Sequence, residues 1–328
     1  MTISDVAKMA DVSVSAVSRY MNGGYVSEEK KERIKKAIQE TGYVPSAHAQ
    51  TMRTKRTKVV GVVIPKINSE SISRVVAGIS EELSEAGYEL LLGNTGNNQE
   101  QELRYLKIFD QNRVDGIIFI GTMMNKEHEK LLKSLQVPVV LLGQQESYIS
   151  CVYHDDYHAA REMAAILAAG KHKKIGFLGV PARDKAVGKE RYRGFCDALS
   201  EAGLPVEDKR VLQGEFTLES GYENARTLME LAPDTDALFC VTDTIAIGAM
   251  KYLREIGKRI PEDVSIAGIG DTRMSEMMNP PLTTAHYYYQ TSGREGAKTL
   301  LEKLKNPDLP DKKMMLGYEI VQRGSILL

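Results

Sequence analysis

Hydrophobic and polar residues follow two different patterns along the chain, and the pattern changes near residue 58. Before that point, apolar residues recur at intervals of three and four, which is typical of short amphipathic helices. After it, runs of consecutive apolar residues such as KVVGVVIP (58–65) alternate with longer amphipathic segments. Continuous apolar runs are typical of strands that are buried on both faces of a parallel sheet. The chain beyond residue 58 is therefore predicted to be an α/β structure.

This alternation repeats often enough to form two doubly wound parallel sheets, one in each of two lobes. Strands are predicted at 58–65, 89–94, 115–121, 137–143, 173–181, 236–241 and 264–270. Helices are predicted near 71–86, 99–112, 127–135, 157–170, 189–202, 218–231 and 243–257. Ligands of such folds bind beside the carboxyl ends of the strands. We therefore expect a ligand site between the lobes.

Three helices are predicted in the first 44 residues. The first has apolar residues at helical spacing and either Thr2 or Ser4 as a start signal. The second extends from about residue 13 to residue 21 and ends before two consecutive glycines. The third begins after Ser27, a favourable N-cap residue, and has two glutamates in its first turn. Two short helices joined by a tight turn and braced by a third predict a helix-turn-helix domain.

The second of these helices has one face of mainly short side chains. On that face lie Val14, Ser15, Ser18 and Arg19, opposite the apolar Val17, Tyr20 and Met21. One interpretation is that Ser13 only caps the helix and that the face is solvated. The other is a recognition helix, whose short side chains let the backbone approach base edges in the major groove while Arg19 reaches phosphate or guanine.

A basic linker follows, and we expect a hinge helix or linker at 45–57. Four basic residues lie at the end of this segment and directly after it: Arg53, Lys55, Arg56 and Lys58. They form either a solvated run of charges or a DNA-binding surface. Met52 precedes them and has no obvious core to join. A short helix in the minor groove that inserts an apolar side chain between base pairs would use this combination. A recognition helix upstream favours that second interpretation.

Charge and cysteine content narrow the class of protein. The net charge is −1, but the first 58 residues contain eleven Lys or Arg and six Asp or Glu, a local balance of +5 that leaves 32 against 38 elsewhere. This local basicity predicts a polyanionic partner for the N-terminal part. The three cysteines form no C-x-x-C pair, which argues against a disulfide framework or zinc site and fits a reducing cytoplasm. The sequence also argues against a secretion signal or a membrane span.

Five segments resemble the LacI/GalR family of bacterial transcription repressors. They are TISDVAKMADVSVSAVSRYMNGG near the N-terminus, then GYVPSAHAQTM, and further along the chain VDGII, PEDVSIAGIGDT and NPPLTT. The resemblance covers essentially the whole chain. It implies a helix-turn-helix domain at 1–44, a hinge at 45–57 and a two-lobed effector-binding and dimerisation core at 58–328. It also implies a homodimer on near-palindromic operator DNA at the nucleoid. The DNA-contacting positions it implies are Ser13, Val14, Ser15, Ser18, Arg19, Asn22, Tyr43, Ala49 and Met52.

Within that family, FLGVPARDKAVGKERYRGF and the segment around IGDT resemble the trehalose operon repressors. This resemblance implies a phosphorylated disaccharide effector, trehalose 6-phosphate, with sucrose 6-phosphate or another phosphosugar as the alternative. The ligand-binding positions it implies are Lys66, Gly121, Gln144, Asp184, Lys185, Ala186, Val187, Arg191, Thr244 and Tyr289. Gln144 replaces a second phosphate-binding arginine of that pattern, and Gly270 replaces a sugar-binding aspartate found in many members of the family.

Several cations are expected near the ligand site, where they could bind a phosphate: Lys66, Lys185, Lys189 and Arg191. For Lys185 and Lys189, an equal alternative is that they are surface residues that only keep the protein soluble. The segment HDDYH (154–158) contains possible metal ligands, but Asp155 or Asp156 is more simply the N-cap of the next helix. We expect no metal, cofactor or enzymatic activity. The alternative function, a sugar-binding receptor without a DNA role, does not explain the basic helical N-terminus.

Overall fold

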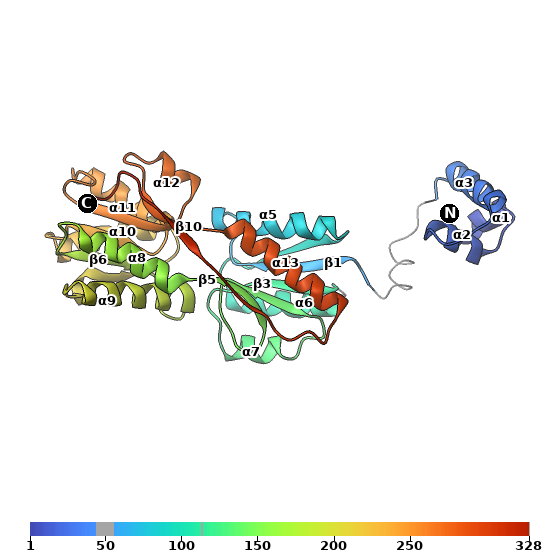
Figure 1. The fold of residues 1–328 in the computed structure, drawn as a ribbon, viewed down its shortest axis with the longest axis horizontal. Coiled ribbons are helices and arrows are strands. Elements are labelled where there is room, and N and C mark those ends of the chain that lie inside the picture. Colours follow the sequence, from blue (N-terminus) through green and yellow to red (C-terminus); the bar gives the residue numbers. More distant parts are fainter. Residues whose placement is uncertain (44–55, 113, 328) are drawn as a thin grey trace. The chain divides into compact units, whose positions relative to one another are not determined.

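The computed structural model describes residues 1–43, 56–112 and 114–327. The chain divides into two compact units, Met1–Thr57 and Lys58–Leu328. Figure 1 shows a small helical unit at the N-terminus and a larger unit of strands and helices. The two units have different kinds of core, because one packs helices together and the other packs helices on sheets.

The N-terminal unit contains α1 (Ile3–Met9), α2 (Val14–Met21) and α3 (Glu28–Thr41). Thr2 caps α1 in a reciprocal capping box with Asp5, and Ser13 caps α2. Ser27 occupies the N-cap position of α3, as predicted, but its side chain makes no capping hydrogen bond. The core of the unit consists of Val6, Ala7, Ala10, Val17, Ile34 and Ala37. The three predicted helices are thus present and share one small apolar core.

The larger unit has two lobes, each built on a six-stranded sheet (Figure 1). The sheet of the N-terminal lobe has the order β11-β5-β4-β3-β1-β2, and all its pairings are parallel. Its strands are β1 (Val59–Ile64), β2 (Glu89–Asn94), β3 (Gly116–Ile120), β4 (Val139–Leu142), β5 (Ser150–His154) and β11 (Lys313–Leu316). Its helices are α5 (Glu70–Glu85), α6 (Gln99–Gln111), α7 (Lys126–Leu132) and α13 (Tyr289–Lys305).

The sheet of the C-terminal lobe has the order β12-β10-β9-β8-β6-β7, and only its edge strand β12 is antiparallel to its neighbour. Its strands are β6 (Ile175–Gly179), β7 (Val211–Gln213), β8 (Ala237–Cys240), β9 (Ser265–Gly270), β10 (Thr283–Tyr287) and β12 (Tyr318–Val321). Its helices are α8 (Asp156–Ala169), α9 (Arg191–Glu201), α10 (Leu218–Leu231), α11 (Asp243–Glu255) and α12 (Arg273–Met277). A six-residue π-helix (Lys185–Glu190) precedes α9, and a short 3-10 helix (Asp208–Arg210) precedes β7.

The chain passes between the lobes three times, once each between β5 and α8, β10 and α13, and β11 and β12. These crossings lie side by side. The backbone N–H of Asp155 donates to the carbonyl of Leu316 at 3.0 Å, and the rings of His154 and Tyr287 stack with centroids 4.5 Å apart. Three adjacent crossings leave the carboxyl ends of both sheets facing the region between the lobes.

Close packing of helices fixes each lobe. On the N-terminal lobe, α5 and α13 run side by side (Figure 1) and meet at two glycines. A Cβ added at Gly78 would approach the carbonyl oxygen of Gln290 to 2.0 Å, and one at Gly293 would approach that of Val75 to 2.0 Å. The absence of side chains at these two positions is therefore what allows the helices to touch.

The structure confirms the predicted α/β class and corrects several bounds. Residues 189–190 belong to the π-helix, so the helix expected at 189–202 begins at Arg191. The helix expected at 127–135 ends at Leu132. No element was predicted where β5, β7, β10, β11, β12, α12 and α13 occur, and the local pattern of these segments did not reveal them.

Candidate functional site

The outer face of α2 carries most of the side chains expected to contact DNA. Ser13, Ser15, Arg19 and Asn22 are exposed, Ser18 is half-buried, and Val14 is exposed although it is apolar. The opposite face of α2 buries Val17 in the core of the unit. An exposed valine beside exposed hydroxyls gives a helix face that could contact both methyl groups and polar edges of bases.

Hydrogen bonds order this face of α2. The hydroxyl of Ser13 accepts the backbone N–H of Ala16 at 3.3 Å and lies 2.9 Å from the hydroxyl of Ser15. The side-chain amide of Asn22 donates to the carbonyl of Ser18. Tyr43 packs against the core of the N-terminal unit. Ala49, Met52, Arg53 and Lys55 lie outside the described residues.

The second group of candidate residues lies at the carboxyl ends of the strands, in the region between the lobes that we call the lobe interface. Lys66 follows β1, Gly121 follows β3 and Gln144 follows β4. From the other lobe, Asp184 to Val187 follow β6 and Thr244 follows β8. This is where a doubly wound sheet binds ligands.

Gln144 connects the two lobes directly. Its Nε2 donates to the carbonyl of Thr122 at 2.9 Å and to Oδ1 of Asp184 at 3.1 Å. Its Oε1 accepts the backbone N–H of Ala186 at 3.3 Å, and Asp184 also accepts the backbone N–H of Val187 at 2.9 Å. Burial raises the pKa of Asp184, although the hydrogen bonds from Val187 and Gln144 act in the opposite direction. Four of the expected ligand positions thus form one hydrogen-bonded network, in which Gln144 and Asp184 are buried.

Some of the cations expected to bind a phosphate are instead paired with carboxylates of the chain. Lys185 pairs with Glu146, and Arg191 pairs with Asp156 through its Nε, 2.7 Å from Oδ1. Lys66 has no carboxylate partner among the described residues, and its Nζ lies 3.5 Å from the carbonyl oxygen of Phe216 in the other lobe. Lys189, which is exposed on the π-helix, also has no carboxylate partner among the described residues, so Lys66 is the half-buried one of the expected cations that keeps its charge uncompensated.

Arg191 belongs to a buried cluster that the sequence did not reveal. Oδ1 of Asp156 accepts from Nε of Arg191 at 2.7 Å and from the hydroxyl of Tyr287 at 3.0 Å. The guanidinium of Arg191 also lies over the ring of Tyr287, 5.1 Å from its centroid, and donates to the carbonyl of Val241. All three side chains are buried. Asp156 was visible in sequence only as a possible helix cap, because its partners lie 35 and 131 residues away.

Tyr289, the first residue of α13, and Gly270, the last residue of β9, lie close together at the lobe interface. Burial raises the pKa of Tyr289 to about 12. A Cβ at Gly270 would lie 3.7 Å from the Tyr289 hydroxyl and 3.6 Å from a carboxylate oxygen of Asp243, and the backbone φ of Gly270 is +143°. An aspartate at this position would be strained and would place a second carboxylate beside Asp243. Thr244 is half-buried in the first turn of α11.

The HDDYH segment is explained by its hydrogen bonds. Asp155 caps α8 by accepting the backbone N–H of His158 at 3.2 Å, which confirms one of the two caps predicted from sequence. Its neighbour Asp156 instead holds Arg191. Within the part of the chain that the structure describes, no group of three or more His, Cys, Asp or Glu side chains could hold a metal ion.

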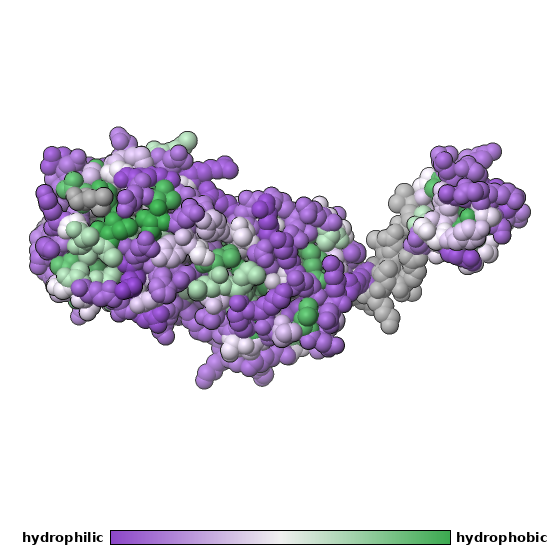
Figure 2. Space-filling view, in the orientation of Figure 1, coloured by the Kyte–Doolittle hydropathy of each residue, from purple (hydrophilic) through white to green (hydrophobic). Residues whose placement is uncertain are grey.

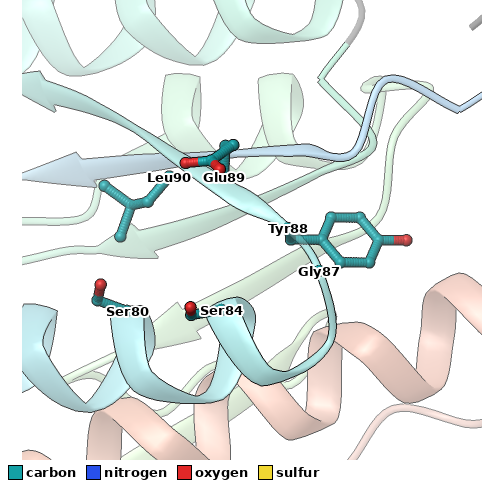
Figure 3. Close-up of a pocket in the computed structure, with 6 residues that line it drawn as sticks. All are labelled: Ser80, Ser84, Gly87, Tyr88, Glu89 and Leu90. Carbon is teal, nitrogen blue, oxygen red and sulfur yellow. The ribbon is translucent and has the colours of Figure 1, made fainter. Parts of the chain in front are cut away.

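Two cavities lie away from the centre of the lobe interface. One of about 420 Å³ is lined by Ser80, Ser84, Gly87, Tyr88, Glu89 and Leu90. Figure 3 shows that Ser80 and Ser84 project from α5 toward β2. Because this cavity lies where β2 begins, it is at the opposite end of the sheet from the candidate ligand residues. The other, about 220 Å³, is bordered by Lys185 and Glu146 at the edge of the lobe interface.

Comparisons with known proteins match both units. The family model for bacterial regulatory proteins of the lacI family matches residues 2–46. The model for periplasmic binding proteins and the sugar binding domain of the LacI family matches residues 57–314. None of the described helices is long and apolar enough to cross a membrane.

Individual relatives extend over nearly the whole chain. The transcriptional repressor PurR of Actinobacillus pleuropneumoniae serotype 3 (strain JL03) is 33% identical over 330 residues, which is 99% of this chain and 98% of PurR. The solved complex of the transcriptional regulator CelR with cellobiose is 30% identical with a TM-score of 0.77, covering 99% of both chains. The lac repressor dimer bound to operator and the anti-inducer ONPF has the same fold, with a TM-score of 0.90 at 23% identity over 100% of this chain and 99% of that one.

Proposed function

This chain belongs to the LacI family of bacterial regulatory proteins, and we propose that it represses a sugar-utilisation operon under the control of a phosphorylated disaccharide. Its relatives are transcription regulators, not enzymes. A DNA-binding repressor with a sugar-binding type of core is therefore the class of protein, and a receptor without a DNA role is excluded by the match of residues 2–46. What remains to propose is how this chain reads DNA, which effector it binds and how the two are coupled.

We assign operator reading to α2. Val14 and Ser15 would contact base edges, and Arg19 would reach further into the major groove. Ser13, Ser18, Asn22 and Tyr43 would contact the phosphate backbone, which positions the helix without selecting sequence. The exposure of Val14, Ser15 and Arg19 supports this assignment, since these side chains are accessible on the outer face of α2.

Residues 1–44 would then form the DNA-binding domain, 45–57 the hinge and 58–328 the effector-binding and dimerisation core. In the hinge, Ala49 and Met52 would lie in the minor groove, with Met52 inserted between base pairs. Its volume and polarity are close to those of leucine, so it suits an apolar wedge. The chain would act on chromosomal DNA at the nucleoid and therefore in the cytoplasm.

The effector proposal depends on one observation, the uncompensated ammonium of Lys66 at the lobe interface. An uncharged sugar does not need a cation there, whereas a phosphate ester gains charge-assisted hydrogen bonds from it. Arg191, held by Asp156, and Tyr289 would contact sugar hydroxyls. CelR in complex with cellobiose supports a disaccharide as the kind of sugar. We favour trehalose 6-phosphate, with sucrose 6-phosphate as the alternative.

A homodimer is the proposed functional state. The surface of the larger unit is mostly hydrophilic but carries apolar patches on the face shown in Figure 2. Large apolar side chains of the C-terminal lobe are among the exposed ones, including Met277, which is 85% exposed. The lac repressor, which shares the fold, is a dimer on its operator. Two copies related by a two-fold axis would present two copies of α2 to a near-palindromic site.

Effector binding would be coupled to DNA binding by a shift between two arrangements of the lobes. In this structure the contacts that connect the lobes include Lys66 with Phe216, Arg74 with Asp271, Glu70 with Arg273, Gln144 with Asp184 and Ala186, and Lys185 with Glu146. An effector that binds one arrangement more tightly moves the equilibrium, while equal affinity for both would change nothing. The hinges of the dimer would then fold on DNA in only one arrangement. Release of DNA by effector is the expected direction.

A thermal-shift panel tests the effector proposal. Trehalose 6-phosphate or sucrose 6-phosphate should raise the Tm of the full chain, while free trehalose and sucrose at the same concentration should not. Lys66→Ala should remove this preference, and Lys107→Ala, which changes an exposed lysine on α6, should not. Stabilisation by the free sugars alone would refute the phosphosugar proposal. Binding to a palindromic duplex that weakens steeply with salt tests the DNA function separately.

A further inference from the structure

His154 has a buried nitrogen that nothing in the described chain satisfies. The residue ends β5 at a crossing between the lobes and is 9% exposed. Among the described residues its Nε2 has no hydrogen-bond partner. Buried polar atoms are nearly always paired, and an unpaired one costs free energy. An unsatisfied nitrogen at this position therefore calls for a partner from outside the chain.

The hydrogen bonding of the imidazole defines what that partner must be. The backbone of Tyr288 hydrogen-bonds the ring in the sense that favours its protonated form, so the ring donates to the carbonyl there. Because Nε2 is the atom without a partner, the donating nitrogen is Nδ1. Burial lowers the pKa of His154 to about 4, so the ring is neutral near pH 7. A neutral ring protonated at Nδ1 presents a lone pair at Nε2, which accepts a hydrogen bond.

Aromatic contacts hold the ring in place. His154 stacks on Tyr287 with centroids 4.5 Å apart and an interplanar angle of 11°. It meets Tyr289 edge-on with centroids 5.4 Å apart. Tyr287 is itself fixed by its hydrogen bond to Asp156, which also holds Arg191. The lone pair is therefore presented by a rigid cluster, which is how binding sites orient their polar groups.

Resting on the proposed function, we propose that His154 is a specificity residue of the effector site whose Nε2 accepts a hydrogen bond from a hydroxyl of the bound sugar. A dianionic phosphate cannot fill this role, because it has no proton to donate. The sugar ring would therefore lie toward His154, Arg191 and Tyr289, and the phosphate toward Lys66. Sugars that lack the matching hydroxyl would leave Nε2 unpaired in the complex and would be selected against.

The test compares the binding of modified sugars by the parent chain and by variants of His154. The full-length chain is screened by thermal shift against trehalose 6-phosphate, sucrose 6-phosphate, glucose 6-phosphate, trehalose, sucrose and cellobiose. The tightest binder then serves as the probe for calorimetric Kd values, together with analogues in which each hydroxyl in turn is replaced by fluorine. Fluorine keeps the size of the group but cannot donate a hydrogen bond.

His154→Phe keeps a ring to stack on Tyr287 and removes Nε2. It should weaken binding of the probe about fivefold to tenfold, the usual effect of one hydrogen bond. One fluorinated analogue should weaken binding to the parent by a similar factor and bind His154→Phe no worse than the probe does. His154→Gln, whose amide reaches the position of Nε2, should restore part of the affinity. His158→Phe, an exposed histidine on α8, is the matched control and should bind like the parent.

The outcomes separate this inference from the proposed function. If the parent binds a member of the panel and His154→Phe binds it equally well, the inference is wrong and the sugar-binding function stands. The same conclusion follows if every fluorinated analogue weakens the parent and His154→Phe alike, since His154 would then act only through packing. If the parent binds no member of the panel, the sugar-binding proposal and this inference both fail.

Discussion

Replacing Asp156 by alanine removes the shared partner of two buried groups. Nε of Arg191 and the hydroxyl of Tyr287 both donate to the same carboxylate oxygen, at 2.7 and 3.0 Å. The side chains of the ion pair are only 5% and 8% exposed. Asp156→Ala would leave the guanidinium of Arg191 with the carbonyl of Val241 and no counter-charge within the cluster.

The expected loss of stability follows from this burial. Breaking a buried ion pair by removing one partner costs about 3–5 kcal/mol, because the remaining charge stays desolvated. For a unit of this size, 1 kcal/mol lowers Tm by roughly 2–4 °C, which gives a decrease of roughly 6–20 °C. Asp156→Asn keeps an acceptor oxygen for both donors and loses only the charge, so it should lie between the parent and Asp156→Ala.

Thermal and urea unfolding of the full-length variants measure the effect. Glu201→Ala is the control, since Glu201 pairs with Arg161 by hydrogen bonds of 2.7 and 2.8 Å but both side chains are well exposed. That surface pair should contribute at most about 1 kcal/mol. A loss for Asp156→Ala no larger than for Glu201→Ala would show that the cluster does not stabilise the core. Effector affinity should fall together with stability, because Arg191 loses the group that orients it.

Three further results are expected. Met52→Gly should weaken operator binding about tenfold or more, as measured by fluorescence anisotropy, because glycine removes the apolar wedge and disfavours a helix. Met52→Leu should bind like the parent. Unchanged affinity for Met52→Gly would exclude the wedge. Ser13→Ala should cost about 1 kcal/mol of α2 stability, seen as faster amide exchange, since Ala16 N–H loses its cap. Burial raises the pKa of Asp184 above 3.8, so the folded state binds the proton more tightly and loses stability as pH rises through that raised pKa. Asp184→Asn should remove this part of the pH dependence in urea unfolding curves, and unchanged curves would contradict it.

Much of the fold could be predicted because it is encoded locally. The strand Glu89–Asn94 and the helix Leu218–Leu231 have the predicted bounds, since the alternation of apolar residues within each segment reflects its own burial. The three short helices of the N-terminal unit could be predicted for the same reason. The candidate DNA-contacting face of α2 also follows from one local period, because residues three and four apart share a side of a helix.

Other elements could not be read from the sequence because distant pairings create them. The edge strands β11 and β12 have weak apolar patterns, and they exist because they pair with β5 and β10. The threonines of β10 are buried with their hydroxyls hydrogen-bonded: that of Thr283 accepts the backbone N–H of Arg323 at 2.9 Å, and that of Thr284 donates to Asp243. A strand of this kind has no hydrophobic signature until its partners are in place.

The sequence by itself determined that Lys66 and Gln144 follow closely after apolar strands, because the local pattern ends β1 and β4 just before them. Arg191 was expected near the ligand only from the family resemblance, since it begins the helix α9. Only the tertiary structure decided the electrostatic state of those side chains. Lys185 meets Glu146 across 39 residues, and Arg191 meets Asp156 across 35, while Lys66 stays without a carboxylate partner among the described residues. Charge–charge interactions depend on distance and desolvation in space, and neither quantity can be obtained from separation along the chain.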